Sequence, residues 1–251
     1  APRTTAKVVY YSVENRRGGA PAAQYYATDV ELDDVARPSF TLHTPNAAPI
    51  PVKLQVFGAH QVSNALAAAA TAIELGLSAE TVASALSGHR IASEHRMDVR
   101  TRRDGVTVID DSYNANPDSM RAAIAALAYT AAARPDARSI AVLGEMGELG
   151  ADADSAHRRL GEVLAKYHVD YLVAVGENAN CWAMTEAAAQ QGITTKVCAD
   201  VDAAAKAVDA ILRTAPVGVD DWASRSVKDV VLVKASNAQR LWLVAEQLNH
   251  S

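Results

Sequence analysis

Residues 106–117 read Val106-Thr107-Val108-Ile109-Asp110-Asp111-Ser112-Tyr113-Asn114-Ala115-Asn116-Pro117, a stretch that changes from apolar to polar residues. The run from Val106 to Asp110 is short and mostly apolar, which predicts a buried strand. Pro117 suits the first position of a helix and Asn116 suits its cap, so we expect a helix from Pro117 to about Thr130. A polar loop therefore joins the end of a buried strand to the start of a helix.

The same alternation continues to the end of the chain. Further strands are expected at Ser139–Leu143, Tyr171–Val175, Thr194–Val197 and Val230–Val233, and further helices at Asp154–Tyr167, Ala179–Gln190, Asp202–Arg213 and Gln239–Leu248. Nearly continuous apolar strands that alternate with helices indicate a parallel sheet covered on both faces. Residues 97–251 are therefore predicted to form a Rossmann-like domain of about five or six strands.

Residues 1–96 show a different pattern, which predicts a separate domain with a β-rich edge and two helices. Strand-like runs cover Lys7–Tyr11, Phe40–Thr44 and Val52–Val56, with Pro49 and Pro51 between the last two. Helical spacing runs from Val62 to Ile73 and ends at Gly76, and Ser78 caps a second helix that Gly88 stops. The pattern changes near Arg90–Asp98. The fold class is therefore α/β, in two domains.

The composition argues against several classes of protein. The net charge of -5 argues against a nucleic-acid-binding protein, and the basic pair Arg16-Arg17 is expected to be a solvated turn. Two cysteines, Cys181 and Cys198, are too few for a disulfide framework and fit a reducing cytoplasm. The histidines have no metal-ligand spacing, so no protein-built metal site is expected. No apolar run is long enough to cross a membrane.

Polar side chains follow four of the predicted strands, where a parallel sheet binds its ligands. These loops are Asp110–Ser119, Gly144–Gly150, Gly176–Asn178 and Lys234–Asn237. Asp110 and Asp111 could accept hydrogen bonds from a ribose or hold water on a metal, and Tyr113, Asn114 and Asn116 could orient a phosphate or peptide. The alternative is an ordinary capped turn.

Single residues in these loops and elsewhere also allow two interpretations. Lys234 could place positive charge beside a phosphoryl group, or be a solvated lysine at a strand end. Glu145 and Glu148 could recognise an ammonium group, or be solvated carboxylates of a flexible turn. His60 and Asn64 share a helix face, and the Asn64 amide could pair with a base edge or be merely exposed. Arg96 could hold a phosphate or form an interdomain salt bridge.

Taken together these motifs resemble the Mur ligase family. The run from Gly58 to Ala69 is similar to a helix motif of the family's central domain, and Asp110–Pro117 closely matches the D-D-S-Y-N-A-N-P signature of the branch that adds D-alanyl-D-alanine. The run from Val142 to Gly150 matches that branch's next loop, and Lys234 stands where the family has a K-G-S-R loop. The resemblance covers nearly the whole chain.

The resemblance implies an ATP-dependent, ADP-forming peptide ligase of peptidoglycan precursor synthesis. ATP would phosphorylate the terminal carboxylate of a UDP-N-acetylmuramoyl-tripeptide, with Mg²⁺ on the phosphates, and D-alanyl-D-alanine would attack the acyl phosphate. Asn64 would contact the adenine, Arg96 and Asp111 the ribose or phosphates, and His60 and Tyr113 would also bind the nucleotide. Asn114, Asn116 and Lys234 would line the cleft as catalytic residues. A monomeric, cytoplasmic enzyme is expected, with neither nucleic acid nor membrane as partner.

The chain also departs from the family. The K-G-S-R loop reads Lys234-Ala235-Ser236-Asn237, and no G-x-x-x-x-G-K-[ST] phosphate loop is present. Since Lys7–Tyr11 resembles a strand entered mid-fold, we expect a fragment, inactive by itself, that continues the family's central ATP-binding domain. Two alternatives remain: another ligase of the Mur and folylpolyglutamate type, or a non-catalytic Rossmann-like nucleotide-binding domain.

Overall fold

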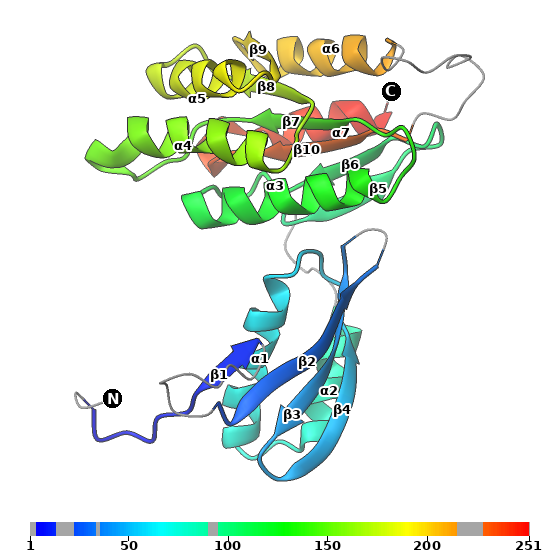
Figure 1. The fold of residues 1–251 in the computed structure, drawn as a ribbon, viewed down its shortest axis with the longest axis vertical. Helices are drawn as coiled ribbons and strands as arrows, with labels where there is room; N and C mark the ends of the chain where they lie inside the picture. The colour runs from blue at the N-terminus through cyan, green and yellow to red at the C-terminus, as the bar shows by residue number, and fades with distance from the viewer. Residues whose placement is uncertain (1–3, 14–22, 34–35, 90–94, 215–227, 251) are drawn as a thin grey trace. The chain divides into compact units, whose positions relative to one another are not determined.

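The computed structural model describes residues 4–13, 23–33, 36–89, 95–214 and 228–250 (Figure 1). The chain divides into two compact units, Ala1–Arg90 and Ile91–Ser251. Both units combine helices with a sheet, which confirms the α/β class. The basic pair Arg16-Arg17 and the first part of the expected boundary, residues 90–94, lie outside the described residues.

The first unit is built on a four-stranded sheet in the order β1-β2-β3-β4. β1 (Tyr11–Val13) runs parallel to β2 (Tyr25–Leu32), and β3 (Pro38–Thr44) and β4 (Ala47–Lys53) follow as antiparallel neighbours. The helices α1 (Gln61–Glu74) and α2 (Ala79–Gly88) pack against the sheet. Their shared core includes Phe40, Leu42, Val52, Val62, Leu66 and Val82.

Three expectations for this unit need correction. The first strand is Tyr11–Val13 rather than Lys7–Tyr11, and the fourth ends at Lys53 rather than Val56. Pro49 and Pro51 do not separate strands but lie inside β4. β4 pairs only with β3, so it is an edge strand, where a residue without a backbone N–H is tolerated.

The second unit contains a six-stranded sheet in the order β5-β6-β10-β7-β8-β9. Its strands are β5 (Asp98–Thr101), β6 (Thr107–Asp110), β7 (Ser139–Leu143), β8 (Tyr171–Val175), β9 (Thr194–Cys198) and β10 (Val230–Lys234). All neighbours are parallel except β5, which pairs antiparallel with β6 at the sheet edge. The expected parallel sheet is confirmed, and β5 is an edge strand that the sequence pattern did not reveal.

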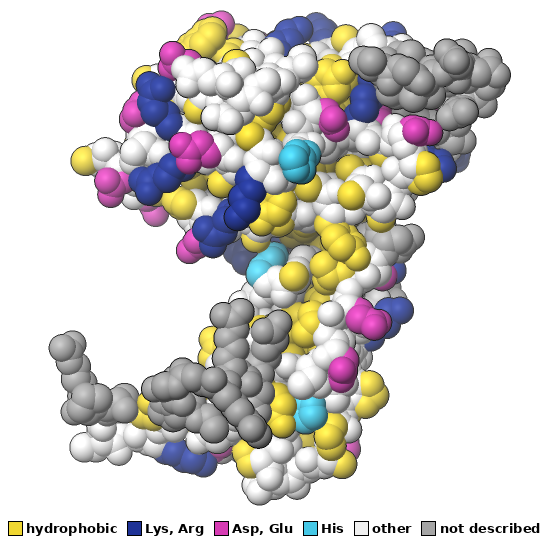
Figure 2. Space-filling model, viewed as in Figure 1, with side chains coloured by type: hydrophobic (Ala, Val, Ile, Leu, Met, Phe, Trp, Pro, Cys, Tyr) yellow, Lys and Arg dark blue, Asp and Glu magenta, His cyan; other side chains and the backbone are white. Residues whose placement is uncertain are grey.

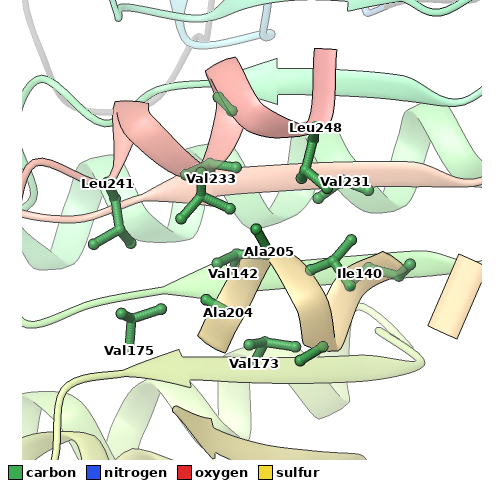
Figure 3. Close-up of a cluster of buried hydrophobic side chains, with 14 of the residues drawn as sticks. Ile140, Val142, Val173, Val175, Ala204, Ala205, Val231, Val233, Leu241 and Leu248 are labelled. Atoms are coloured by element: carbon green, nitrogen blue, oxygen red, sulfur yellow. The ribbon is translucent and has the colours of Figure 1, made fainter. Parts of the chain in front are cut away.

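Helices cover both faces of this sheet (Figure 1). They are α3 (Pro117–Ala132), α4 (Ala153–Lys166), α5 (Ala179–Gln190), α6 (Val201–Leu212) and α7 (Trp242–His250), with 3-10 turns at Gly150–Asp152 and Asn237–Gln239. The last helix was expected from Gln239, but Gln239 belongs to the preceding turn. On one face, Val142, Val173 and Val231 point toward Ala204 of α6 and Leu248 of α7 (Figure 3).

The two ends of the strands differ in character. At the amino end of β7, Arg138 forms a buried ion pair with Asp229, with its Nη2 2.6 Å from the carboxylate. The same guanidinium donates to the carbonyl oxygen of Thr214. The side chains of this pair are engaged with neighbouring parts of the chain, and the pair therefore stabilises the sheet. Polar groups with exposed surface gather instead at the carboxyl end.

Candidate functional site

Lys234, at the carboxyl end of β10, is buried with 1% of its surface exposed. Its ammonium donates to the Asp111 carboxylate at 2.6 Å, the Asn114 carbonyl at 2.7 Å and the Asp111 carbonyl at 3.3 Å. A lysine ammonium has three N–H donors, and all three find oxygens of one loop. The interpretation of Lys234 as a solvated lysine is therefore wrong, because its charge holds the loop after β6 against β10.

Asp111 joins a third segment to this cluster. Its second carboxylate oxygen accepts a hydrogen bond from the backbone N–H of Met97 at 3.1 Å. One aspartate thus ties together the segment before β5, the loop after β6 and the end of β10. Since both carboxylate oxygens are engaged, Asp111 is an organising residue of the site as well as a candidate ligand contact.

The two asparagines of this loop are exposed and differ in role. Asn114 accepts a hydrogen bond from the N–H of Ala115 at 2.8 Å. Asn116 caps α3: its side chain accepts from the N–H of Ser119 at 2.8 Å, and Ser119 Oγ accepts from the N–H of Asn116 at 3.1 Å. The capping role expected from the sequence is confirmed. A role of either residue in catalysis stays a prediction.

Arg96 and Tyr113 form an exposed pair beside the cluster. The guanidinium carbon of Arg96 lies 4.1 Å from the centroid of the Tyr113 ring, within the range of a cation–π interaction. Tyr113 is also held through its backbone, which donates to the carbonyl of His95 at 2.9 Å. The pair places a positive charge and an aromatic hydroxyl together at the surface, an arrangement that suits a phosphate or sugar group.

A histidine–aspartate pair lies next to them and was not found by sequence reasoning. His95 Nδ1 is 2.7 Å from Asp110 Oδ2, and the other Asp110 oxygen accepts from the N–H and hydroxyl of Ser112. The His95 ring stacks on Trp242 with centroids 5.2 Å apart. His95 and Asp110 are fifteen residues apart with no motif between them. They come together because the unexpected strand β5 pairs with β6 and sets Asp98 opposite Asp110.

Gly144 lets a second pair of loops interlock. An added Cβ at Gly144 would lie 1.9 Å from Oε1 of Gln239 and 2.8 Å from Cβ of Ala235. The same Gln239 oxygen accepts a hydrogen bond from the N–H of Glu145 at 2.9 Å. Glycine is required here to make room for that side chain. The sequence shows the glycine at position 144, but it does not show that Gln239 lies against it.

The predicted nucleotide contacts Asn64 and His60 lie in the first unit, at the start of α1. Asn64 and His60 are both exposed there. The Asn64 amide donates to Oε1 of Gln61 at 3.0 Å, and the His60 ring packs so close to Gly58 that an added Cβ would be 2.7 Å away. Gly58 also has a φ of +99°, which favours glycine. These residues share one end of a helix, and their nucleotide role stays a prediction.

Other features constrain the chemistry. Among the described residues, no group of three or more His, Cys, Asp or Glu side chains is arranged to hold a metal ion. Cys181 and Cys198 are free and buried. On the face of the second unit seen in Figure 2, basic and acidic side chains are interspersed. Arg158 forms ion pairs with Asp154 and Glu186.

No helix in the described part of the chain has the length and apolar character that a membrane span requires.

Comparisons with known proteins agree with this geometry. The family described as "Mur ligase, glutamate ligase domain" matches residues 95–237. A UDP-N-acetylmuramoyl-tripeptide--D-alanyl-D-alanine ligase of Mycobacterium bovis is 46% identical over 99% of this chain and 48% of its own length. The chain therefore spans about half the length of this relative.

Two solved structures are similar in fold. A crystal structure of MurF from Acinetobacter baumannii superposes with a TM-score of 0.74 at 28% identity, over 91% of this chain and 45% of that one. A MurF ligase from Thermotoga maritima, solved in complex with ADP, gives a TM-score of 0.68 at 23% identity, over 90% of this chain and 46% of that one.

Proposed function

The chain belongs to the Mur ligase family, and from this premise we propose that it is part of an ATP-dependent, ADP-forming amide ligase. The enzyme joins D-alanyl-D-alanine to a UDP-N-acetylmuramoyl-tripeptide in peptidoglycan precursor synthesis. The observation that carries the proposal is the relative of that name, which is 46% identical over 99% of this chain. The signature Asp110–Pro117 supports it, because this loop is the centre of the Lys234 cluster.

In this proposal residues 1–96 are the end of the central ATP-binding domain and residues 97–251 are the carboxyl-terminal domain. ATP transfers its γ-phosphoryl group to the terminal carboxylate of the tripeptide. The amine of the dipeptide then attacks the acyl carbon, the C–O bond to phosphate breaks, and the amine loses a proton. Amide, ADP and phosphate leave. Positioning and charge neutralisation supply most of the catalysis of such a phosphoryl transfer.

Each candidate residue receives a role that fits its position. Asn64 contacts the adenine, His60 binds the nucleotide beside it, and Arg96 with Tyr113 contacts the ribose or phosphates. Asn114 and Asn116 present their exposed surface to the reacting groups. Lys234 acts by holding the loop 111–114, because its ammonium has no donor left for a substrate phosphate.

Magnesium is part of the proposed reaction, but the described residues do not form a site for it. Asp111 is engaged by Lys234 and Met97, and Asp110 by His95 and Ser112. Neither carboxylate offers an oxygen free of protein partners. Mg²⁺ commonly keeps several waters and binds through substrate phosphates with one or two carboxylates. In this proposal Mg²⁺ would therefore be held through the substrate phosphates rather than directly by Asp110 or Asp111.

The proposal further places the enzyme in the cytoplasm as a monomer. The free, buried cysteines support a reducing compartment, where thiols persist. The test of the function uses the full-length protein that contains this chain. Phosphate release from ATP should require both the tripeptide nucleotide and D-alanyl-D-alanine, and omission of either should reduce it to background. Equal release without the dipeptide would refute the proposed ligase.

A further inference from the structure

Glu145 lies at the carboxyl end of β7, where three loops meet. Its N–H donates to Oε1 of Gln239 at 2.9 Å, and its carbonyl accepts from the N–H of Ser236 at 3.0 Å. The preceding residue, Gly144, donates to the carbonyl of Lys234 at 2.9 Å. The backbone of Glu145 is therefore fixed on both sides, directly beside the strand end that carries the Lys234 cluster.

The side chain of Glu145 is held by neutral groups. Asn180 Nδ2 donates to Oε1, and Asn178 Nδ2 lies 3.4 Å from Oε2. Among the residues that the structure describes, no Lys, Arg or His forms an ion pair with this carboxylate. Its charge reaches the interior: the pKa of the Cys181 thiol rises to about 11, chiefly through burial and secondarily through the negative charge of Glu145.

A half-buried carboxylate without a cationic partner is costly, because neutral hydrogen bonds replace only part of its hydration. A ligand that brings the missing cation stabilises such a charge. Glu145 stands at the carboxyl ends of neighbouring parallel strands, the edge at which this class of sheet binds ligands. The arrangement therefore has the properties of a cation subsite.

The donor set favours an organic ammonium over a metal ion. A magnesium or calcium ion takes six or more oxygen ligands, whereas two amide nitrogens face this carboxylate. No metal-binding group of three side chains was found among the described residues. A primary ammonium needs acceptors for its N–H groups and gains most from one charged oxygen, which Glu145 supplies.

We propose that Glu145 binds the ammonium group of the incoming dipeptide, and that Asn178 and Asn180 orient the Glu145 carboxylate for that contact. The inference rests on the proposed function, since that reaction supplies a substrate with a free ammonium group. The bond from Gly144 to Lys234 sets this subsite next to the loop 111–114. Glu148, in the same loop, is exposed, which fits its interpretation as a solvated carboxylate. It therefore serves as the matched control.

The test is Glu145→Gln in the full-length protein, a change that removes the charge and keeps the shape. The KM for D-alanyl-D-alanine should rise by about tenfold or more, the effect of losing one charge-assisted hydrogen bond. The KM values for ATP and for the tripeptide nucleotide should not change, and Glu148→Gln should match wild type for all three substrates. An unchanged KM for the dipeptide, or an equal rise for all three substrates, would overturn the inference.

A measurement on the wild-type protein covers the case in which Glu145→Gln does not fold. The dipeptide analogue with a hydroxyl in place of its amine keeps the shape and lacks the positive charge. We expect its inhibition constant to exceed the Kd of the dipeptide by about tenfold or more. Equal affinity of the two would overturn the inference alone. A wild-type protein inactive with the dipeptide would instead overturn the proposed function, and this inference with it.

Discussion

Replacing Lys234 by methionine removes one charge from the centre of the site and keeps most of the side-chain volume. The substitution leaves the Asp111 carboxylate, with 15% of its side chain exposed, without its cation. It also removes the donor to the carbonyl oxygens of Asp111 and Asn114. The loop that carries the family signature therefore loses its side-chain attachment to β10, and it keeps the backbone hydrogen bond from the N–H of Asp111 to the carbonyl of Val233.

The expected cost follows from this geometry. Removing one partner of a buried ion pair typically destabilises a protein by about 3–5 kcal/mol, because the remaining charge is buried and unpaired. The two unsatisfied carbonyls increase the cost only where the loop cannot turn them to water. We therefore expect local stability to fall by about 3 kcal/mol at least, and turnover to fall by at least about tenfold.

Native-state amide hydrogen exchange of the full-length protein measures this loss where it occurs. A loss of about 3 kcal/mol corresponds to exchange faster by roughly two orders of magnitude in the segments that open. Peptides from β10 and the loop after β6 should show this acceleration. Peptides from α5, which has no contact with the Lys234 ammonium, should exchange as in wild type.

The double variant Lys234→Met, Asp111→Asn separates the charge from the shape. With both charges removed neither side chain leaves an unpaired buried charge at this position, so the double variant should recover much of the stability lost in the single variant. Protection in Lys234→Met equal to wild type would refute the reasoning. So would a double variant destabilised by the sum of the two single effects, since that would mean that the pair has no coupling energy.

Three other predictions address separate parts of the chain. Asn64→Ala should raise the KM for ATP with turnover nearly unchanged, because an adenine contact acts alike in ground and transition states; an unchanged KM would leave Asn64 a merely exposed helix residue. Gly144→Ala should destabilise the protein by about 1–3 kcal/mol in thermal unfolding, since the new Cβ displaces Gln239 from the Glu145 N–H. Gly147→Ala is the control, with its nearest neighbour at 3.8 Å, and equal melting temperatures of the two variants would contradict this. Cys181, with its pKa raised to about 11 mainly by burial, should stay a thiol at pH 8 and be alkylated far more slowly than in the unfolded chain; equal rates would show that it is accessible.

The sequence predicted the parallel sheet well, because buried parallel strands are continuous apolar runs. The bounds of β7 and β8 match the expectation to the residue. β4 and β5 are edge strands, and one side of each strand has no neighbouring strand. Prolines in β4 and exposed arginine in β5 therefore obscured both. Edge position is a tertiary property that local pattern does not carry.

The site could be predicted only as far as topology determines it. Parallel strands bring their carboxyl ends to one edge, so the gathering of Asp111, Asn114 and Lys234 follows from strand order alone. Burial of the Lys234 ammonium does not follow. A lysine at a strand end left open a solvated side chain, and the three internal acceptors of Lys234 exclude that interpretation. The contacts of His95 with Asp110 and of Gln239 with Glu145 depend on β5 and on a 3-10 turn, neither of which the pattern revealed.

Missing from the sequence is a phosphate-binding loop, which bears directly on activity. The purified 251-residue chain should form no amide from ATP, the tripeptide nucleotide and D-alanyl-D-alanine, because phosphoryl transfer depends on positioning and charge neutralisation by such a loop. Amide formation by this chain alone, dependent on all three substrates, would contradict the expectation.

Isotope transfer in the full-length enzyme tests the acyl-phosphate mechanism directly. The tripeptide nucleotide is labelled with ¹⁸O in its terminal carboxylate and incubated with ATP and D-alanyl-D-alanine, and the products are weighed by mass spectrometry. The mass of the product should equal that of the nucleotide plus the dipeptide less one water, with one carboxylate ¹⁸O recovered in the inorganic phosphate. Release of phosphate without that label, or absence of the joined product, would contradict an acyl-phosphate ligase.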